Sequence, residues 1–138
     1  MINFFNEDIS FTLKNKRKTK AWLSDSIKRE NYNTGDISFI FCSDDFLHKM
    51  NVQYLNHDTL TDVITFDYSE DKMISGDIFI SIPRVKDNAV EFEKKFSDEL
   101  NRVMVHGIMH LCGYKDKTKK DAAHMRLKEE EHLAHIPS

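Results

Sequence analysis

Cysteine is scarce in this chain of 138 residues, and long apolar runs are missing from it. The two cysteines, Cys42 and Cys112, form no C-x-x-C pair, which argues against a disulfide framework and a zinc site of four thiolates. We expect both to be small buried hydrophobic side chains. No apolar run approaches the roughly 18 residues of a membrane span. Residues 1–13 are acidic and polar, unlike a signal peptide. We therefore expect a cytoplasmic protein without a membrane partner.

The composition is that of one folded domain. Hydrophobic residues make up 40% of the chain and charged residues 31%, which suits a globular protein rather than a disordered one. No internal repeat or low-complexity tract divides the sequence. At this length a single domain spanning residues 1–138 buries about two-thirds of the surface that the unfolded chain exposes.

Two histidines and an aspartate between residues 106 and 116 are the strongest chemical signal. His106 and His110 are four residues apart, which is about 400° on an α-helix, so both imidazoles project from one face and can bind one metal ion. Gly113 is well placed to end that helix in the left-handed conformation. The chain can then return with Asp116 as a third ligand. Three protein ligands and an open position are typical of a catalytic metal site, although a histidine pair alone is as often a packing feature.

The same spacing is found in the zinc-protease motif H-E-x-x-H-x-x-G-x-x-H, with one difference in kind. The protease has a glutamate general base directly after its first histidine, where this chain has Gly107. Without that carboxylate, peptide hydrolysis lacks its proton acceptor. The motif therefore indicates a metal site and argues against a metallopeptidase, which stays a lesser alternative.

The net charge of −3 is unevenly distributed. Residues 14–20 and 115–120 are basic, whereas residues 129–131 are three glutamates. Basic clusters bind phosphate backbones, but a charged run is also the ordinary composition of a solvated helix face. The second basic cluster flanks the predicted metal site, so we take its lysines as candidate substrate-binding residues: Lys115, Lys117, Lys119 and Lys120.

The stretch from His106 to Tyr114, H-G-x-x-H-L-x-G-Y, resembles the signature of the YbeY family of bacterial metal-dependent endoribonucleases. Residues 50–54 and 61–66 are similar to the family's L-N-x-x-Y-R and T-D-V-L-S-F, and residues 76–81 provide a third match. These segments follow the family order over roughly residues 36–116.

The resemblance implies a hydrolase, an endoribonuclease that cuts single-stranded RNA in ribosomal RNA maturation and ribosome quality control. Its partner would be RNA, either ribosomal RNA or the small ribosomal subunit. His106, His110 and Asp116 would hold one Zn²⁺ and act through its bound water, with Mn²⁺ or another divalent ion as an alternative.

The chain departs from the family pattern at two positions. The family motif ends with aspartate and histidine, where this chain has Lys115 and Asp116, so the third ligand stays open and His124 is the main alternative donor. His57, in a polar segment, is a less favoured candidate. Leu55 replaces an arginine thought to take part in catalysis. This replacement favours the alternative of a non-cleaving, metal-stabilised ribosome-assembly factor.

The pattern of apolar residues predicts an α+β fold, a small mixed β-sheet of about four strands backed by helices, and the resemblance implies the same. We expect strands at residues 2–5, 37–42, 62–66 and 76–82, and a helix from Pro83 to about Lys95. Ser97 is expected to cap a central helix that carries the metal pair at the edge of its apolar stripe. Gly107 falls inside that stripe, where the close approach of a strand would explain a glycine.

A last helix is expected from Thr118 to Ala134, because Thr118 and Asp121 resemble a capping box. It is crowded with lysine and glutamate. We therefore expect its histidines to lie at the surface: His124, His132 and His135.

Overall fold

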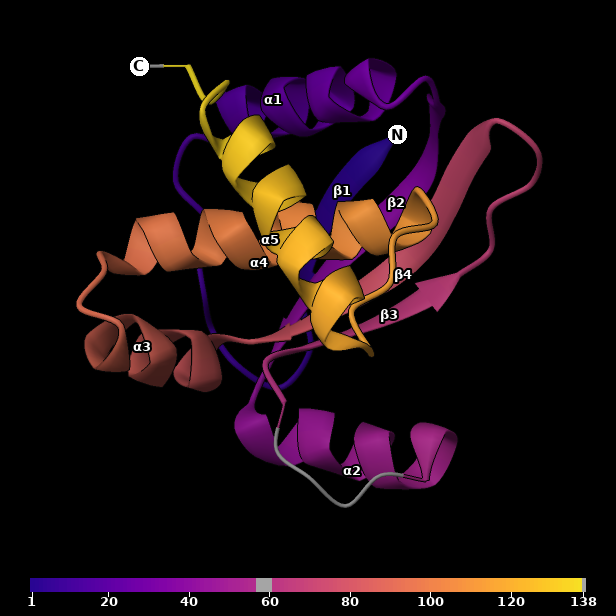
Figure 1. The fold of residues 1–138 in the computed structure, drawn as a ribbon. Helices are drawn as coiled ribbons and strands as arrows, with labels where there is room; N and C mark the ends of the chain where they lie inside the picture. The colour runs from indigo at the N-terminus through magenta and orange to yellow at the C-terminus, as the bar shows by residue number, and fades with distance from the viewer. Residues whose placement is uncertain (57–60, 138) are drawn as a thin grey trace.

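The computed structural model describes residues 1–56 and 61–137, so His57 lies outside the described residues. The chain forms four strands and five helices within them (Figure 1), in the order β1 (Ile2–Asn6), α1 (Lys16–Arg29), β2 (Asn33–Cys42), α2 (Asp44–Leu55), β3 (Val63–Asp67), β4 (Met73–Ser81), α3 (Ile82–Glu91), α4 (Phe96–Leu111) and α5 (Lys119–Leu133).

The sheet has the strand order β1-β2-β4-β3. Strand β2 pairs in parallel with both β1 and β4, whereas β3 pairs with β4 in antiparallel fashion. This mixed four-stranded sheet with helices confirms the predicted α+β fold. Among the described residues, no helix is both long enough and apolar enough to cross a membrane.

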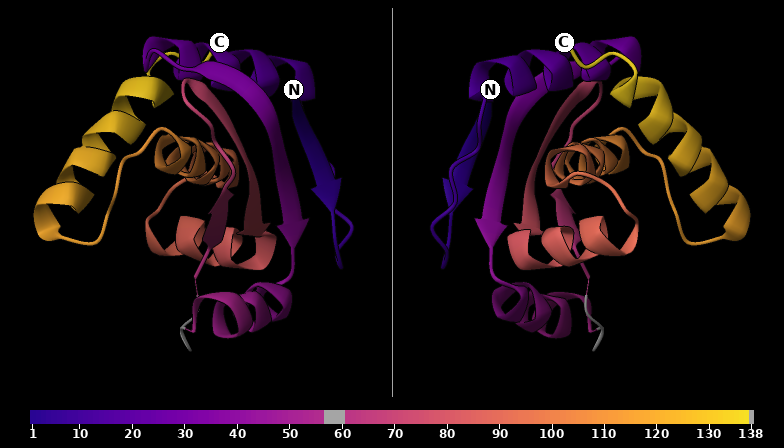
Figure 2. Two further views of the ribbon diagram at one scale, coloured as in Figure 1. Left: turned by 90° about the vertical axis from the view of Figure 1, so that its right-hand side faces the viewer. Right: turned by 90° about the vertical axis from the view of Figure 1, so that its left-hand side faces the viewer.

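Helix α4 packs on one face of the sheet, and α5 lies outside it (Figure 2). The alternation of side chains in a strand places Ile37, Phe39 and Phe41 of β2 on that covered face, where all three are buried. On α4 the predicted apolar stripe is buried as well. Helix α4 therefore runs through the middle of the hydrophobic core, as expected for the helix that carries the metal pair.

Gly107 is the point of closest approach between α4 and β4. A Cβ atom built on Gly107 would lie 2.8 Å from Cγ2 of Ile78, which is closer than side chains pack. The expected close approach of a strand is thus confirmed. This contact sets the distance between α4 and the sheet, and therefore the position of the two histidines relative to β3.

Helix α2 belongs to a second, smaller core on the opposite face of the sheet, where Leu47 packs with Cys42 and Ile64. Ser43 caps α2, because its Oγ accepts a hydrogen bond from the Phe46 backbone N at 3.1 Å. Cys42 and Cys112 are both buried and unpaired, as predicted, and burial raises the pKa of each thiol to about 12.

Two predicted features near α4 are wrong. The helix begins at Phe96 with Lys95 at the N-cap position, so Ser97 lies inside the first turn and caps nothing. Helix α3 ends at Glu91, and Glu93 then takes a positive φ of 55°. This left-handed residue turns the chain early, which a local pattern of apolar residues does not reveal.

Candidate metal centre

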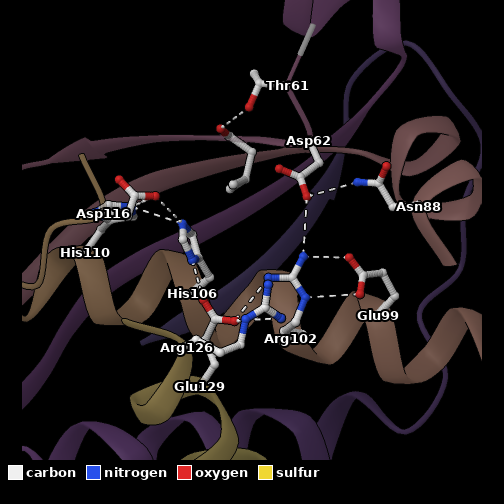
Figure 3. A network of polar contacts seen from close by, with 11 residues as sticks. Thr61, Asp62, Asn88, Glu99, Arg102, His106, His110, Asp116, Arg126 and Glu129 are labelled. Carbon is white, nitrogen blue, oxygen red and sulfur yellow. Dashed lines mark hydrogen bonds and ion pairs between the residues drawn. The ribbon is translucent and has the colours of Figure 1, made fainter. Parts of the chain in front are cut away.

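His106 and His110 lie one turn apart near the C-terminal end of α4 and face the same side (Figure 3). Their Nε2 atoms are 3.0 Å apart. The side chain of His106 is 14% exposed and that of His110 is 28% exposed, so both lie where the core meets solvent. The predicted pairing of the two imidazoles is therefore present in the folded chain.

Asp116 joins this pair because the chain reverses direction after α4. Gly113 has a φ of 99°, a conformation that favours glycine, and its N–H donates to the carbonyl of His110. Oδ2 of Asp116 then lies 3.3 Å from Nε2 of His106 and 3.5 Å from Nε2 of His110. The glycine stop predicted from the sequence thus brings the third candidate ligand to the first two.

The three side chains have the donor chemistry and spacing of a metal site. Ligand bonds of about 2.0–2.2 Å at the tetrahedral angle place two ligand atoms about 3.3–3.6 Å apart. The three observed separations, 3.0, 3.3 and 3.5 Å, are close to that range. Burial, and next the neighbouring His106, lower the pKa of His110 below its ordinary value despite Asp116, which favours the neutral imidazole that metals bind.

Glu129 on α5 fixes the orientation of His106. Its Oε2 lies 2.6 Å from Nδ1 of His106, and its side chain is only 3% exposed. Burial alone would raise the pKa of Glu129. The hydrogen bond with His106 and the nearby Arg102 outweigh it, so the net pKa is below the ordinary value. An ionised Glu129 accepts a hydrogen bond from the Nδ1–H group of His106, which leaves the lone pair of Nε2 directed at the candidate metal position.

A buried network of charges holds Glu129 in turn. Nη1 of Arg102 lies 3.1 Å from Oε1 of Glu129. The same guanidinium binds Glu99 with two hydrogen bonds, of 3.0 and 2.6 Å, and reaches Asp62 at 3.7 Å. Figure 3 shows this network, in which Asn88 donates to Asp62. Arg102 is thus the counter-ion of all three carboxylates, and none of them is buried without a positively charged partner.

Glu129 was not predicted as a site residue, because it stands in a run of three glutamates. A signal was present, because Met125, Glu129 and His132 recur at helical spacing and are the buried residues of α5. His132 was predicted at the surface, and that prediction is wrong, since the residue is fully buried. The other two, His124 and His135, are exposed as expected.

His132 belongs to a second polar cluster, behind the loop that carries Asp116. Its Nε2 lies 2.7 Å from Oε2 of Glu30, and the Tyr114 hydroxyl donates to Oε1 of Glu30 at 2.6 Å. Lys128 Nζ lies 3.2 Å from both Glu30 and Glu131. Although Glu30, Glu131 and His132 could together hold a cation, the lysine ammonium already lies between the two carboxylates. This cluster therefore serves to anchor Tyr114, two residues before Asp116.

The three candidate ligands open into a groove of about 580 Å³, here called the metal groove. Strand β3 and the residues before it form one wall, and α4 forms the other. Leu55 stands at its rim. Of the four candidate substrate-binding lysines, Lys117 lines the groove, whereas the other three are exposed outside it: Lys115, Lys119 and Lys120.

His124, the alternative third donor, packs edge-on against the Tyr114 ring with the ring centroids 5.3 Å apart. It is not a member of either cluster of potential ligands found among the described residues. Asp116 is therefore the better candidate for the third ligand.

Comparison with known proteins places the chain in a family. Residues 1–137 match the profile of the family described as endoribonuclease YbeY. An endoribonuclease YbeY of Flavobacterium johnsoniae is 55% identical over 134 residues, which cover 97% of this chain and 96% of the relative. Another, from Christiangramia forsetii, is 50% identical over 133 residues, which cover 96% of this chain and 92% of the relative. A solution structure from Thermotoga maritima shares the fold, with a TM-score of 0.66, 28% identity, and coverage of 99% of this chain and 89% of that one. The match over nearly the whole length confirms the resemblance, and the chain belongs to the endoribonuclease YbeY family.

Proposed function

We propose that this protein is a metal-dependent endoribonuclease that hydrolyses single-stranded RNA. The observation that carries the proposal is the convergence of His106, His110 and Asp116 on one point inside an open groove. The named relatives are endoribonucleases, which selects RNA among phosphodiester substrates.

His106, His110 and Asp116 would hold one divalent ion, Zn²⁺ in the first instance and Mn²⁺ or another ion as alternatives. Such an ion supplies a Lewis acid that polarises a phosphoryl oxygen and makes water a better nucleophile. The chain's own residues prepare the site. Glu129 accepts a hydrogen bond from Nδ1–H of His106. Gly113 turns the chain so that Asp116 becomes the third candidate ligand.

The substrate would lie along the metal groove, between β3 and α4. Lys117 stands in the groove and is the candidate for a phosphate contact next to the reacting bond. The three exposed lysines outside it, Lys115, Lys119 and Lys120, are candidates for contacts with flanking phosphates. As biological substrate we propose ribosomal RNA, reached on the small ribosomal subunit during its maturation and quality control in the cytoplasm.

A non-cleaving assembly factor is the second candidate, and one observation favours it. Leu55 lies at the rim of the metal groove with 42% of its surface exposed, where the family pattern has a cationic arginine. An apolar side chain there cannot stabilise developing negative charge on a phosphate.

A metallopeptidase is disfavoured by the position of Gly107. The Cβ direction of this residue points at Ile78 of the sheet and away from the metal groove. A general base is therefore missing at the place where the zinc proteases have one.

The test is cleavage of a single-stranded RNA by purified protein, with and without a chelator, followed by restoration with Zn²⁺ or Mn²⁺. His110→Ala is the control for contaminating nuclease, because it removes a ligand and should abolish both metal binding and cleavage. A duplex of the same sequence should stay intact. Stoichiometric metal without any cleavage would support the assembly factor instead, and metal-dependent cleavage of casein would support the peptidase.

A further inference from the structure

A second basic segment, residues 14–20, stands apart from the metal groove. It contains five cations and no acidic residue: Lys14, Lys16, Arg17, Lys18 and Lys20. Within residues 1–56 and 61–137, none of the five forms an ion pair. Some cations elsewhere in the chain are paired, as Arg84 is with Asp44 and Arg102 with Glu99.

This arrangement is unfavourable for the isolated chain. Lys16, Arg17 and Lys18 form the first turn of α1, which holds no acidic side chain, and Lys16 and Lys20 are like charges at i and i+4. Both arrangements work against the helix. Unlike a solvated helix face of mixed charge, residues 14–20 carry charge of one sign only, in a protein with a net charge of −3. Its charge is complementary to a polyanion.

A cavity of about 470 Å³ lies directly beside these cations, between the start of α1, the start of α4 and the C-terminal tail. We call it the α1 pocket. Its wall is aromatic, with the Phe11 and Phe96 rings in edge-to-face contact at a centroid distance of 5.9 Å and Trp22 beside them. Trp22 is itself buried, and its indole N–H donates to the His132 carbonyl, so it supports the wall of the pocket from behind.

The rim of the α1 pocket is polar and positively charged. Lys14 and Lys18 line it, together with the uncharged side chains of Asn15, Ser97 and Asn101. A volume within the range of about 300–1,000 Å³, an apolar wall and a few polar groups are the features of a small-ligand site. Aromatic rings next to cations suit one ligand chemistry in particular, a flat base with a phosphate on either side.

We propose that the α1 pocket is a second RNA-binding site, in which one unpaired base stacks on the Phe11 ring and meets the nearly perpendicular Phe96 ring edge-on. Lys14 and Lys18 then contact the phosphates that flank this base. The choice of RNA among polyanions rests on the proposed function. Phe96 and His110 are fourteen residues apart on α4, which is about 21 Å along the helix axis. The α1 pocket therefore holds a strand remote from the bond that is cut, and only a substrate long enough to reach both places uses it.

The experiment measures binding of a fluorescent single-stranded RNA to chelator-treated protein over a series of salt concentrations, with a gel to show that the RNA stays intact. The test variant is Lys14→Gln with Lys18→Gln. The matched control is Lys28→Gln with Lys72→Gln, which removes the same charge from exposed positions elsewhere. Loss of two phosphate contacts should flatten the slope of log affinity against log salt by about 1.4 and weaken binding roughly tenfold or more at low salt. The control should do neither.

A second variant, Phe11→Leu, separates stacking from charge. It should weaken RNA binding by about five- to a hundredfold and leave the salt slope unchanged, because the lost contact is with a base. Cleavage of a short oligonucleotide should be equal in wild-type protein and in the lysine variant, whereas cleavage of a long RNA should fall in the variant.

Three results would overturn the inference. They are equal losses in the test and control lysine pairs, unchanged binding in both pocket variants, and a mononucleotide that binds as tightly as RNA. Failure of the proposed function would look different. The wild-type protein would cut no RNA, but the Lys14→Gln, Lys18→Gln variant would still bind RNA more weakly than the wild type. The α1 pocket would then be the RNA-binding site of a non-cleaving factor.

Discussion

Nδ1 of His106 and Oε2 of Glu129 lie 2.6 Å apart, although 23 residues separate them in the chain. The contact joins α4 to α5 and leaves His106 one tautomer with its Nε2 free of a proton. A metal ion bound by His106 would therefore depend on Glu129, which is not among the three candidate ligands. Partners of this kind typically change metal affinity by about 10–100-fold.

The first prediction follows from this contact. Glu129→Gln keeps the shape of the side chain but removes its charge, so His106 loses a carboxylate acceptor and Arg102 loses one of its counter-ions. We expect zinc affinity to fall about 10–100-fold, as measured by competition with a chromogenic chelator. The neighbouring Glu130→Gln, at an exposed position, is the control and should bind zinc as the wild type does. Equal affinity in both variants would show that Glu129 only packs.

The second prediction concerns the depth at which α4 packs. Gly107→Ala improves helix propensity by about 1 kcal/mol, but its Cβ meets Cγ2 of the β-branched Ile78 at 2.8 Å. Overpacking of this kind costs about 1–3 kcal/mol, so we expect a net loss of stability in urea unfolding. Since Ile78→Ala removes the clashing methyl group, the double variant should be less destabilised than the sum of the two singles. Strict additivity would mean that the helix and β4 separate freely at this point.

The third prediction is a dependence of stability on pH. Burial alone would raise the pKa of Glu30, but hydrogen bonds from Tyr114, His132 and Lys128 outweigh it and hold the pKa below its ordinary value of 4.5. A carboxyl group whose pKa is lower in the folded state stabilises the protein above its unfolded-state pKa. That contribution is lost as pH falls through the folded-state value.

Urea unfolding of the metal-free protein should therefore show less stability at each step below about pH 4.5, with a shallower decline in Glu30→Gln. Glu131→Gln is the control, because Glu131 contacts the same Lys128 and His132 but is 54% exposed. An identical decline in wild type and Glu30→Gln would assign the acid sensitivity to other carboxylates.

Local patterns predicted the features that depend on local geometry. The helical spacing of His106 and His110 and the preference of glycine for a positive φ at Gly113 hold in any fold that keeps the helix. The mixed sheet was likewise predictable, because each strand is apolar and its side chains alternate. The burial of the two cysteines follows likewise, because Cys42 ends the apolar strand β2 and Cys112 directly follows the apolar stripe of α4.

Features that depend on how distant elements pack could not be predicted in this way. Glu129 and His132 are polar residues of a highly charged helix, and only the docking of α5 beside α4 and α1 decides which of its faces is buried. The N-cap at Lys95 had no side-chain signal, since Lys95 makes no capping hydrogen bond. The sequence of α5 shows this burial only through the spacing of Met125 with those two residues.

The last prediction concerns Asp116, which stands where the family pattern has its third histidine. Two neutral imidazoles leave both charges of a divalent ion uncompensated, whereas the Asp116 carboxylate cancels one. A carboxylate also suits harder ions such as Mn²⁺ better than an imidazole does. Oδ2 of Asp116 lies within 3.5 Å of both histidine Nε2 atoms, so the place for a third donor is already formed.

We therefore expect Asp116→His to shift the ratio of zinc to manganese affinity towards zinc, as measured by competition titration of the metal-free protein. Asp116→Asn should weaken both ions, because it keeps the shape but loses the charge, and it should leave the unfolding free energy of the metal-free protein unchanged since Asp116 is 41% exposed. His124→Ala serves as the control, as its ring packs against Tyr114 and it belongs to neither cluster of potential ligands among the described residues. Wild-type zinc affinity in Asp116→Asn together with loss of zinc in His124→Ala would transfer the third ligand from the loop after Gly113 to α5.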